Sequence, residues 1–233
     1  SPSGIVLTYD GTISGTGSLT TSGAGTVSIF NSSNTYSGGT TIAEGTTQIQ
    51  ADGSLGTGNI TLNGGSLLTP SSLTTSKAIS VTSSSSILVT ADVTLNLQGL
   101  ITGSSPLTIS GELSGEGAGP ATVSITQDNI DFFGDVTLEN VNCTIDRRIG
   151  IGTGSATLNS AKLIIPTTFS LAKNFTLSNA LVPIRGAEIE VATNATFTSG
   201  GTFTGTDLTK LGGGDLTLVG KPYDHELSNS CDQ

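Results

Sequence analysis

The feature that most constrains this chain is an ungapped internal repeat at an offset of 96 residues. The repeat runs from Val27, which returns as Val123 (123 − 27 = 96), to Lys77, which returns as Lys173. Other matched pairs are Gly38 and Gly134, Ile49 and Ile145, Pro70 and Pro166, and the aromatic residues Tyr36 and Phe132. Long repeats in a strand-forming sequence are typical of solenoids, in which each coil packs only on its neighbours.

Two changes of the offset mark insertions into this repeat. Ile13 aligns with Ile101 at an offset of 88 (101 − 13), and Ile101 aligns with Phe203 at 102 (203 − 101). Insertions into a repeat array belong on loops that leave the stack. We therefore expect loops at Ser110–Pro120 and near Val182–Ala187, and these loops are where we would first look for partner contacts. Their residues include Gly111, Glu112, Gly115, Glu116, Gly119 and Arg185.

The composition excludes several classes of function. Charged residues make up only 11% of the chain, against roughly 25% in typical soluble domains. The net charge is −10, with eight basic residues, which disfavours binding to nucleic acids or to anionic membrane surfaces. The 32 glycines supply turn positions with positive φ. With neither Trp nor Met, the chain is not expected to build a large aromatic ligand groove.

Two cysteines are too few for a disulfide-built scaffold. Cys143 aligns with Thr47 and has apolar residues at alternate positions, Val141 and Ile145. We expect Cys143 to be a small buried thiol. Cys231 lies in a polar tail, and a Cys143–Cys231 bridge stays open as an alternative.

Short apolar or alternating runs, separated by Gly-rich or Asn-rich turns, predict many short strands. Phe169–Ala180 is the nearest candidate for a helix, but it is rich in Thr and Asn and aligns with a strand pattern. The spacing predicts an all-β parallel solenoid of about ten coils, with roughly 20 to 25 residues each and a height on the order of 50 Å. Inward Val, Ile, Leu and Phe would form one continuous column. Two β-sandwich domains joined near residue 98 are the competing interpretation.

The segment Leu19–Leu68 contains an ordered series of short phrases. They are Leu19-Thr20, Gly23-Ala24-Gly25-Thr26-Val27, Asn34-Thr35-Tyr36-Ser37-Gly38-Gly39-Thr40-Thr41-Ile42, Gly45-Thr46, Gly53-Ser54-Leu55-Gly56, Gly58-Asn59-Ile60-Thr61-Leu62 and Asn63-Gly64-Gly65-Ser66-Leu67. In order and spacing they resemble the passenger-associated repeat of bacterial autotransporter proteins. Leu208–Leu218 resembles a further opening phrase. Thr47 departs from the usual Leu, and Asp135 and Val141 replace Gly39 and Gly45 in the second unit.

This resemblance implies a right-handed parallel β-helix that is secreted across the outer membrane through a C-terminal barrel. We expect residues 1–220 to form a passenger fragment of two units, approximately 11–98 and 99–200, plus the start of a third, followed by a polar tail at 221–233. The barrel and a signal peptide are absent from this sequence, so we expect it to be part of a larger protein. The expected location is extracellular, at the bacterial cell surface, without direct membrane insertion of this fragment.

The chemistry-bearing residues are sparse. The most charged stretch holds Asp128, Asp131, Asp135, Glu139, Asp146, Arg147 and Arg148. Asp131 and Asp135 share a face if this stretch is extended, and paired carboxylates are what glycoside hydrolysis requires. Solvated loop positions are the simpler interpretation, and the same holds for His225 beside Asp224 and Glu226. We therefore assign no catalytic, cofactor-binding or metal-binding residue.

Three functions follow from these observations. The first, which the resemblance implies, is a non-enzymatic stalk or adhesin with a role in virulence, whose partners are host-cell or neighbouring-cell surface molecules, or further copies of itself. A β-helical enzyme that degrades polysaccharide, as a hydrolase or lyase, is the second, and a phage or fibre stalk is the third. A one-dimensional stack can fold from one end, which suits assisted translocation.

Overall fold

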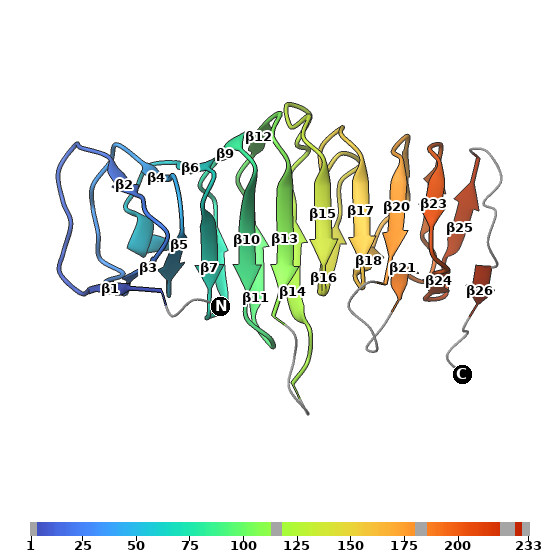
Figure 1. The fold of residues 1–233 in the computed structure, drawn as a ribbon. Helices are drawn as coiled ribbons and strands as arrows, with labels where there is room; N and C mark the ends of the chain where they lie inside the picture. The colour runs from blue at the N-terminus through green and yellow to red at the C-terminus, as the bar shows by residue number, and fades with distance from the viewer. Residues whose placement is uncertain (1–3, 113–117, 180–185, 220–226, 230–233) are drawn as a thin grey trace.

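The chain forms a parallel β-solenoid, an elongated stack of short strands, in a computed structural model that describes residues 4–112, 118–179, 186–219 and 227–229 (Figure 1). The paired strands run parallel, and neighbours within a sheet come from successive coils. One short 3-10 helix, η1 (Asp52–Leu55), is the only helix in these residues. The predicted all-β parallel fold is thereby confirmed. The alternative of two sandwich domains is excluded, because the stack continues past residue 98 without interruption.

A ten-stranded sheet, which we call the first face, runs along most of the stack. Its strands are β1 (Val6–Tyr9), β3 (Thr26–Ile29), β5 (Thr46–Ile49), β7 (Ser66–Thr69), β10 (Ser85–Val89), β13 (Leu107–Gly111), β15 (Val136–Glu139), β17 (Ala156–Asn159), β20 (Phe175–Ser178) and β23 (Phe203–Gly205). Each strand adds one coil, which agrees with the prediction of about ten coils.

An eight-stranded sheet forms the second face. Its strands are β8 (Leu73–Thr75), β11 (Thr94–Leu97), β14 (Ala121–Ile125), β16 (Val141–Ile145), β18 (Lys162–Ile165), β21 (Ala187–Val191), β24 (Leu208–Leu211) and β26 (Leu227–Asn229). β26 falls within the sequence predicted as a polar tail, and it pairs with β24.

The third face consists of two sheets in succession. The first has five strands: β2 (Leu19–Thr21), β4 (Thr40–Ile42), β6 (Ile60–Asn63), β9 (Ile79–Ser83) and β12 (Ile101–Gly103). The second has three: β19 (Phe169–Leu171), β22 (Thr196–Ser199) and β25 (Asp215–Leu218). Both occupy the same place in the coil, because the step from the start of β12 to the start of β13 (107 − 101) equals the step from β19 to β20 (175 − 169).

Coil length explains where the insertions lie. The early partners Val6, Thr26, Thr46 and Ser66 follow one another at a constant spacing (26 − 6, 46 − 26 and 66 − 46). The coil from Leu107 to Val136 is longer (136 − 107 against 26 − 6), and it contains the predicted loop after β13. The coil from Phe175 to Phe203 is also long (203 − 175), and its extra length lies between β20 and β21, mostly outside the described residues.

Register between coils stacks inward side chains into columns. Because side chains alternate across a strand, every second residue of each strand points into the stack. On the first face one column begins at Thr47 and continues with buried aliphatic residues in each later coil: Leu67, Ile87, Ile109, Leu138, Leu158 and Leu177. Full burial of such a side chain contributes about 1.5–3 kcal/mol, so this column is a main source of stability.

Residues that match at the offset of 96 lie on different faces of the solenoid, because the second copy begins one face further along the coil than the first. Val27 lies in β3 on the first face, whereas Val123 lies in β14 on the second. The local structure of one turn between strands is the same in both copies. Gly56 and Gly152 adopt φ of 64° and 73° and lie against the rings of Tyr36 and Phe132. The two copies therefore share local geometry. The offset of 96 residues corresponds to four coils plus the step from one face to the next.

Truncation of a column residue will show how much this packing contributes. Leu158→Ala removes a fully buried side chain from the middle of the column, and we expect it to lower the free energy of unfolding by about 2–5 kcal/mol. Thr157→Ala, on the outward side of the same strand, is the matched control and should change it by less than about 1 kcal/mol. Urea unfolding followed by circular dichroism measures both. Equal losses of unfolding free energy in the two variants would contradict the claim that the inward column stabilises the fold.

The thiol of Cys143 provides a second test. Cys143 is fully buried in β16 as a free thiol, and burial raises its pKa to about 12. Cys231 lies outside the described residues. In a Cys231→Ser variant at pH 8, we expect Cys143 to resist alkylation until the protein is unfolded in urea, because the reactive thiolate is absent. Mass spectrometry of the peptide measures the modified fraction, and equal labelling in native buffer would show that the thiol is accessible.

Candidate functional site

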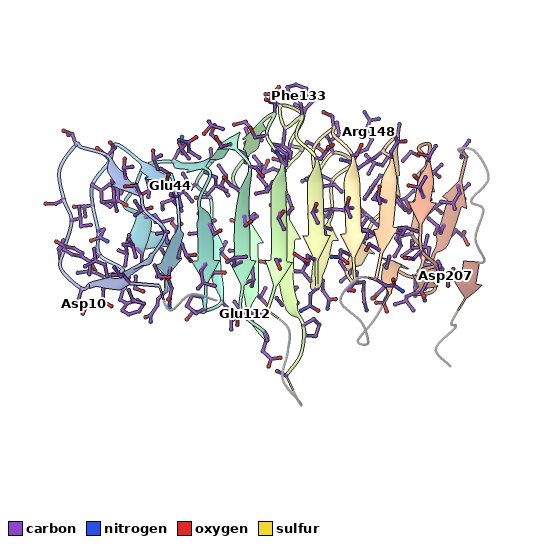
Figure 2. The ribbon with its side chains drawn as sticks, viewed as in Figure 1. Asp10, Glu44, Glu112, Phe133, Arg148 and Asp207 are labelled. Carbon is purple, nitrogen blue, oxygen red and sulfur yellow. The ribbon has the colours of Figure 1, made fainter. Side chains whose placement is uncertain are left out.

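The most charged part of the sequence folds into two neighbouring corners of the solenoid. Residues 126–135 join β14 to β15, and residues 146–155 join β16 to β17 one coil later. The corners lie on each other, since the backbone N–H of Thr153 donates to the carbonyl of Phe132 at 2.8 Å. Figure 2 shows Phe133 and Arg148, one from each corner, projecting from the same edge of the stack.

Buried residues hold the first corner in place. Asn129 is buried, its side-chain oxygen accepts the Ile101 N–H at 2.7 Å, and its amide donates to the carbonyl of Gly150. It therefore connects three coils. Asn34 does the same in an early corner, where it accepts from the Ile13 N–H and donates to the carbonyl of Ser54. Phe132 is also buried and completes the anchor.

The other side chains around these two anchors point mostly to solvent. Ile130 and Phe133 are 58% and 61% exposed, which is unusual for large apolar side chains. Asp128, Asp131 and Asp135 are exposed beside them. We call the segment Asp128–Asp135 the corner ridge. It is an apolar surface edged by carboxylates, and the solenoid holds it rigidly through Asn129 and Phe132.

Most of the charged side chains have structural contacts. Asp128 accepts the backbone N–H of Ile149 at 3.2 Å, and Asp135 accepts that of Ser155 at 2.8 Å, so each caps the following coil. Glu139 accepts the side-chain amide of Asn159 at 3.0 Å. The Nε of Arg147 donates to the carbonyl of Thr126 and lies 3.9 Å from a carboxylate oxygen of Asp146.

The carboxylates considered for catalysis have different surroundings. Asp131 and Asp135 are both exposed and alternate with buried residues, as a shared outward side requires. Asp135 is held by the next coil, whereas the side chain of Asp131 makes no hydrogen bond or ion pair with the described part of the chain.

The two inserted loops are described only in part. Asn140, with φ of 48°, donates to the carbonyls of Gly111 and Glu112 where the first loop leaves β13. The backbone N–H of Gly119 donates to Asp92 at 2.7 Å where the loop returns. Gly115 and Glu116 lie outside the described residues, as do Arg185 of the second loop and the tail residues Asp224, His225 and Glu226.

Comparison with known proteins gives no relative. No protein family matches the chain, and neither a curated protein nor a solved structure is significantly similar to it. Among the described residues, no three His, Cys, Asp or Glu side chains gather as metal ligands would. Nor do those residues include a helix long and apolar enough to cross a membrane.

The anchoring role of Asn129 can be measured. Asn129→Ala leaves the buried N–H of Ile101 without its acceptor, and we expect a loss of about 1–3 kcal/mol in the free energy of unfolding. Hydrogen exchange should accelerate at Ile101 and around Gly150. Asn96→Ala is the control, because the side chain of Asn96 donates to the hydroxyl of Thr74 at the exposed surface of the second face. Unchanged exchange at Ile101 would show that Asn129 does not hold the corner.

Proposed function

We propose that this chain is a non-enzymatic structural and adhesive segment of a bacterial autotransporter passenger, located at the cell surface. The phrases between Leu19 and Leu68 support the autotransporter part of the proposal. The observation that carries the structural part is the uninterrupted first face, in which ten parallel strands build one elongated stack. Such a body suits a stalk because it holds surface residues at fixed spacing along its length.

Folding of such a stack supports the suggested role in translocation. Contacts are made almost entirely between adjacent coils, so a coil can fold as soon as the one before it is in place. The end coil offers a surface for the next one.

The corner ridge is the first candidate for contact with a cell-surface partner. Rigid, exposed apolar groups beside charges are common in recognition surfaces, because they bury area without first losing conformational entropy. The ridge has two such groups, Ile130 and Phe133, on a corner that is anchored from within. A polysaccharide-degrading enzyme remains the alternative, and Asp131 and Asp135 are the residues that would carry it.

Binding measurements on the purified chain test the proposal. We expect it to bind host cells or matrix, or to self-associate, without turning over a glycan. Replacing Ile130 and Phe133 by Ser should weaken surface binding roughly tenfold while circular dichroism stays unchanged. Tyr9→Ser, an exposed aromatic on the first coil, is the matched control.

Either of two results would favour another function over the proposed adhesin. Release of product from a uronate-containing glycan, abolished by Asp131→Asn or Asp135→Asn, would indicate a hydrolase or lyase. A trimer that resists detergent, seen by light scattering and gel electrophoresis, would indicate a fibre stalk.

A further inference from the structure

A buried lysine lies at the turn from the third face to the first face, in the coils that follow the corner ridge. Lys173 sits between β19 and β20 with only 3% of its surface exposed. Its ammonium group donates to the carbonyl of Ile151 at 3.2 Å and to that of Gly154. Within the described residues, no carboxylate lies within ion-pairing distance of it. A buried cation without a counter-ion is costly, so its presence calls for an explanation.

The first copy of the repeat contains the same lysine with a counter-ion. Lys77 aligns with Lys173, and its ammonium pairs with the Asp52 carboxylate at 2.6 Å. The backbones match as well. Gly99 lies against the carbonyl of Lys77, and Gly201 against that of Lys173, so closely that neither position has room for a Cβ. The two lysines therefore have matching local surroundings in the two copies, at corners one face apart: Lys77 lies between β8 and β9, and Lys173 between β19 and β20.

In the second copy an arginine stands at the position of the counter-ion. The residue that aligns with Asp52 at the offset of 96 is Arg148 (148 − 52). In both copies the lysine follows this position at the same spacing, since 77 − 52 equals 173 − 148. Arg148 is exposed and has no ion-pair partner among the described residues. Where the first copy holds an ion pair, the second has an exposed arginine, and the ammonium group of its lysine donates to backbone carbonyls.

These two cations line one groove. The groove has a volume of about 460 Å³, a size in the range of small-molecule sites. Besides Arg148 and Lys173, the hydroxyl-bearing residues Thr153, Ser170 and Thr198 line it, and Ile149, Leu171 and Val219 supply an apolar part. Gly200 also lines it, and a Cβ at that position would meet only Ala172, at 3.7 Å. The space is therefore open rather than filled by a longer side chain.

We propose that this groove binds an oxyanion group, a carboxylate, sulfate or phosphate, carried by a ligand about the size of a sugar. The bound group takes the place that the Asp52 carboxylate has beside Lys77. Arg148 offers a planar pair of donors suited to such groups, Lys173 adds a fixed charge from below, and the hydroxyls of Ser170 and Thr198 provide neutral donors. The site rests on these residues alone and is independent of the adhesive function proposed above.

The charges around the groove give the site a pH dependence. Burial lowers the pKa of Lys173 to about 8, and the Asp135 carboxylate opposes that shift only in part. Arg148 stays charged throughout. Below pH 8 both cations are present, and above it Lys173 loses its proton. Binding of an anion should therefore weaken as the pH rises through 8, and a bound anion should raise the pKa of Lys173.

Titration calorimetry on the full chain tests the site with sulfate, phosphate and glucuronate, and with glucose as the uncharged control. We expect at least one of the three anions to bind at pH 6.5, more weakly at pH 9.5, and glucose not to bind. If sulfate or phosphate binds and glucuronate does not, the site recognises a sulfate or phosphate group. Preference for glucuronate would indicate an acidic sugar.

Substitutions then locate the binding. Arg148→Asp restores the ion pair of the first copy, and we expect it to reduce affinity by at least about tenfold while the fold stays intact. Arg147→Ser, the neighbouring arginine that does not line the groove, should leave affinity unchanged. Gly200→Gln should block the groove without touching either cation. Wild-type affinity in Arg148→Asp, or no binding of any anion by the folded wild-type chain, would overturn the proposal, whatever the adhesion assays show.

Discussion

The parallel pairing of each coil with the coil before it is the constraint on which the rest of this structure depends. A parallel ladder fixes register residue by residue, so each inward side chain lies on its counterpart one coil earlier. The column from Leu67 to Leu177 follows directly from that register. Aromatic residues also meet in register: Phe175 and Phe203 stack with ring centres 4.9 Å apart, and Phe169 and Phe197 meet edge to face at 5.5 Å. The interior therefore repeats from coil to coil, while the outside is free to vary.

Much of the fold could be predicted because this constraint is visible in the sequence. The inward pattern requires apolar residues at alternate positions and glycine at tight corners, and both recur at fixed offsets. The extra length of the coil between β13 and β15 is likewise visible in the sequence, as a change in the offset between matching residues. The sequence does not show that the two copies of the repeat begin on different faces of the solenoid. Val27 and Val123 are equally apolar on any face, and only the strand pairing assigns them to different sheets. Three-residue strands such as β8 and β12 are too short to show alternation.

The candidate sites were harder to predict, for a different reason. The importance of Lys173 lies in its relation to Arg148 in the preceding coil, and the spacing between them has meaning only when the length and path of the coil are known. Both lysines belong to the repeat, so similarity pointed to them, but the informative fact is the difference between Asp52 and Arg148. The exposed pair Ile130 and Phe133 had no sequence signal either, since apolar residues beside a buried Phe132 are expected to be core.

A solenoid can tolerate the cost of such a site better than a compact domain can. Its stability is approximately a sum over coils and the interfaces between them, so an uncompensated charge in one coil weakens mainly that coil and its neighbours. The column of the first face is intact in the strand that follows Lys173 and in the coil before it, with Leu177 and Leu158 almost fully or fully buried. Loss of the Asp52-type carboxylate therefore need not unfold the stack. Lys173 is thus held by two backbone carbonyls where Lys77 has a carboxylate, and the stack accommodates both arrangements.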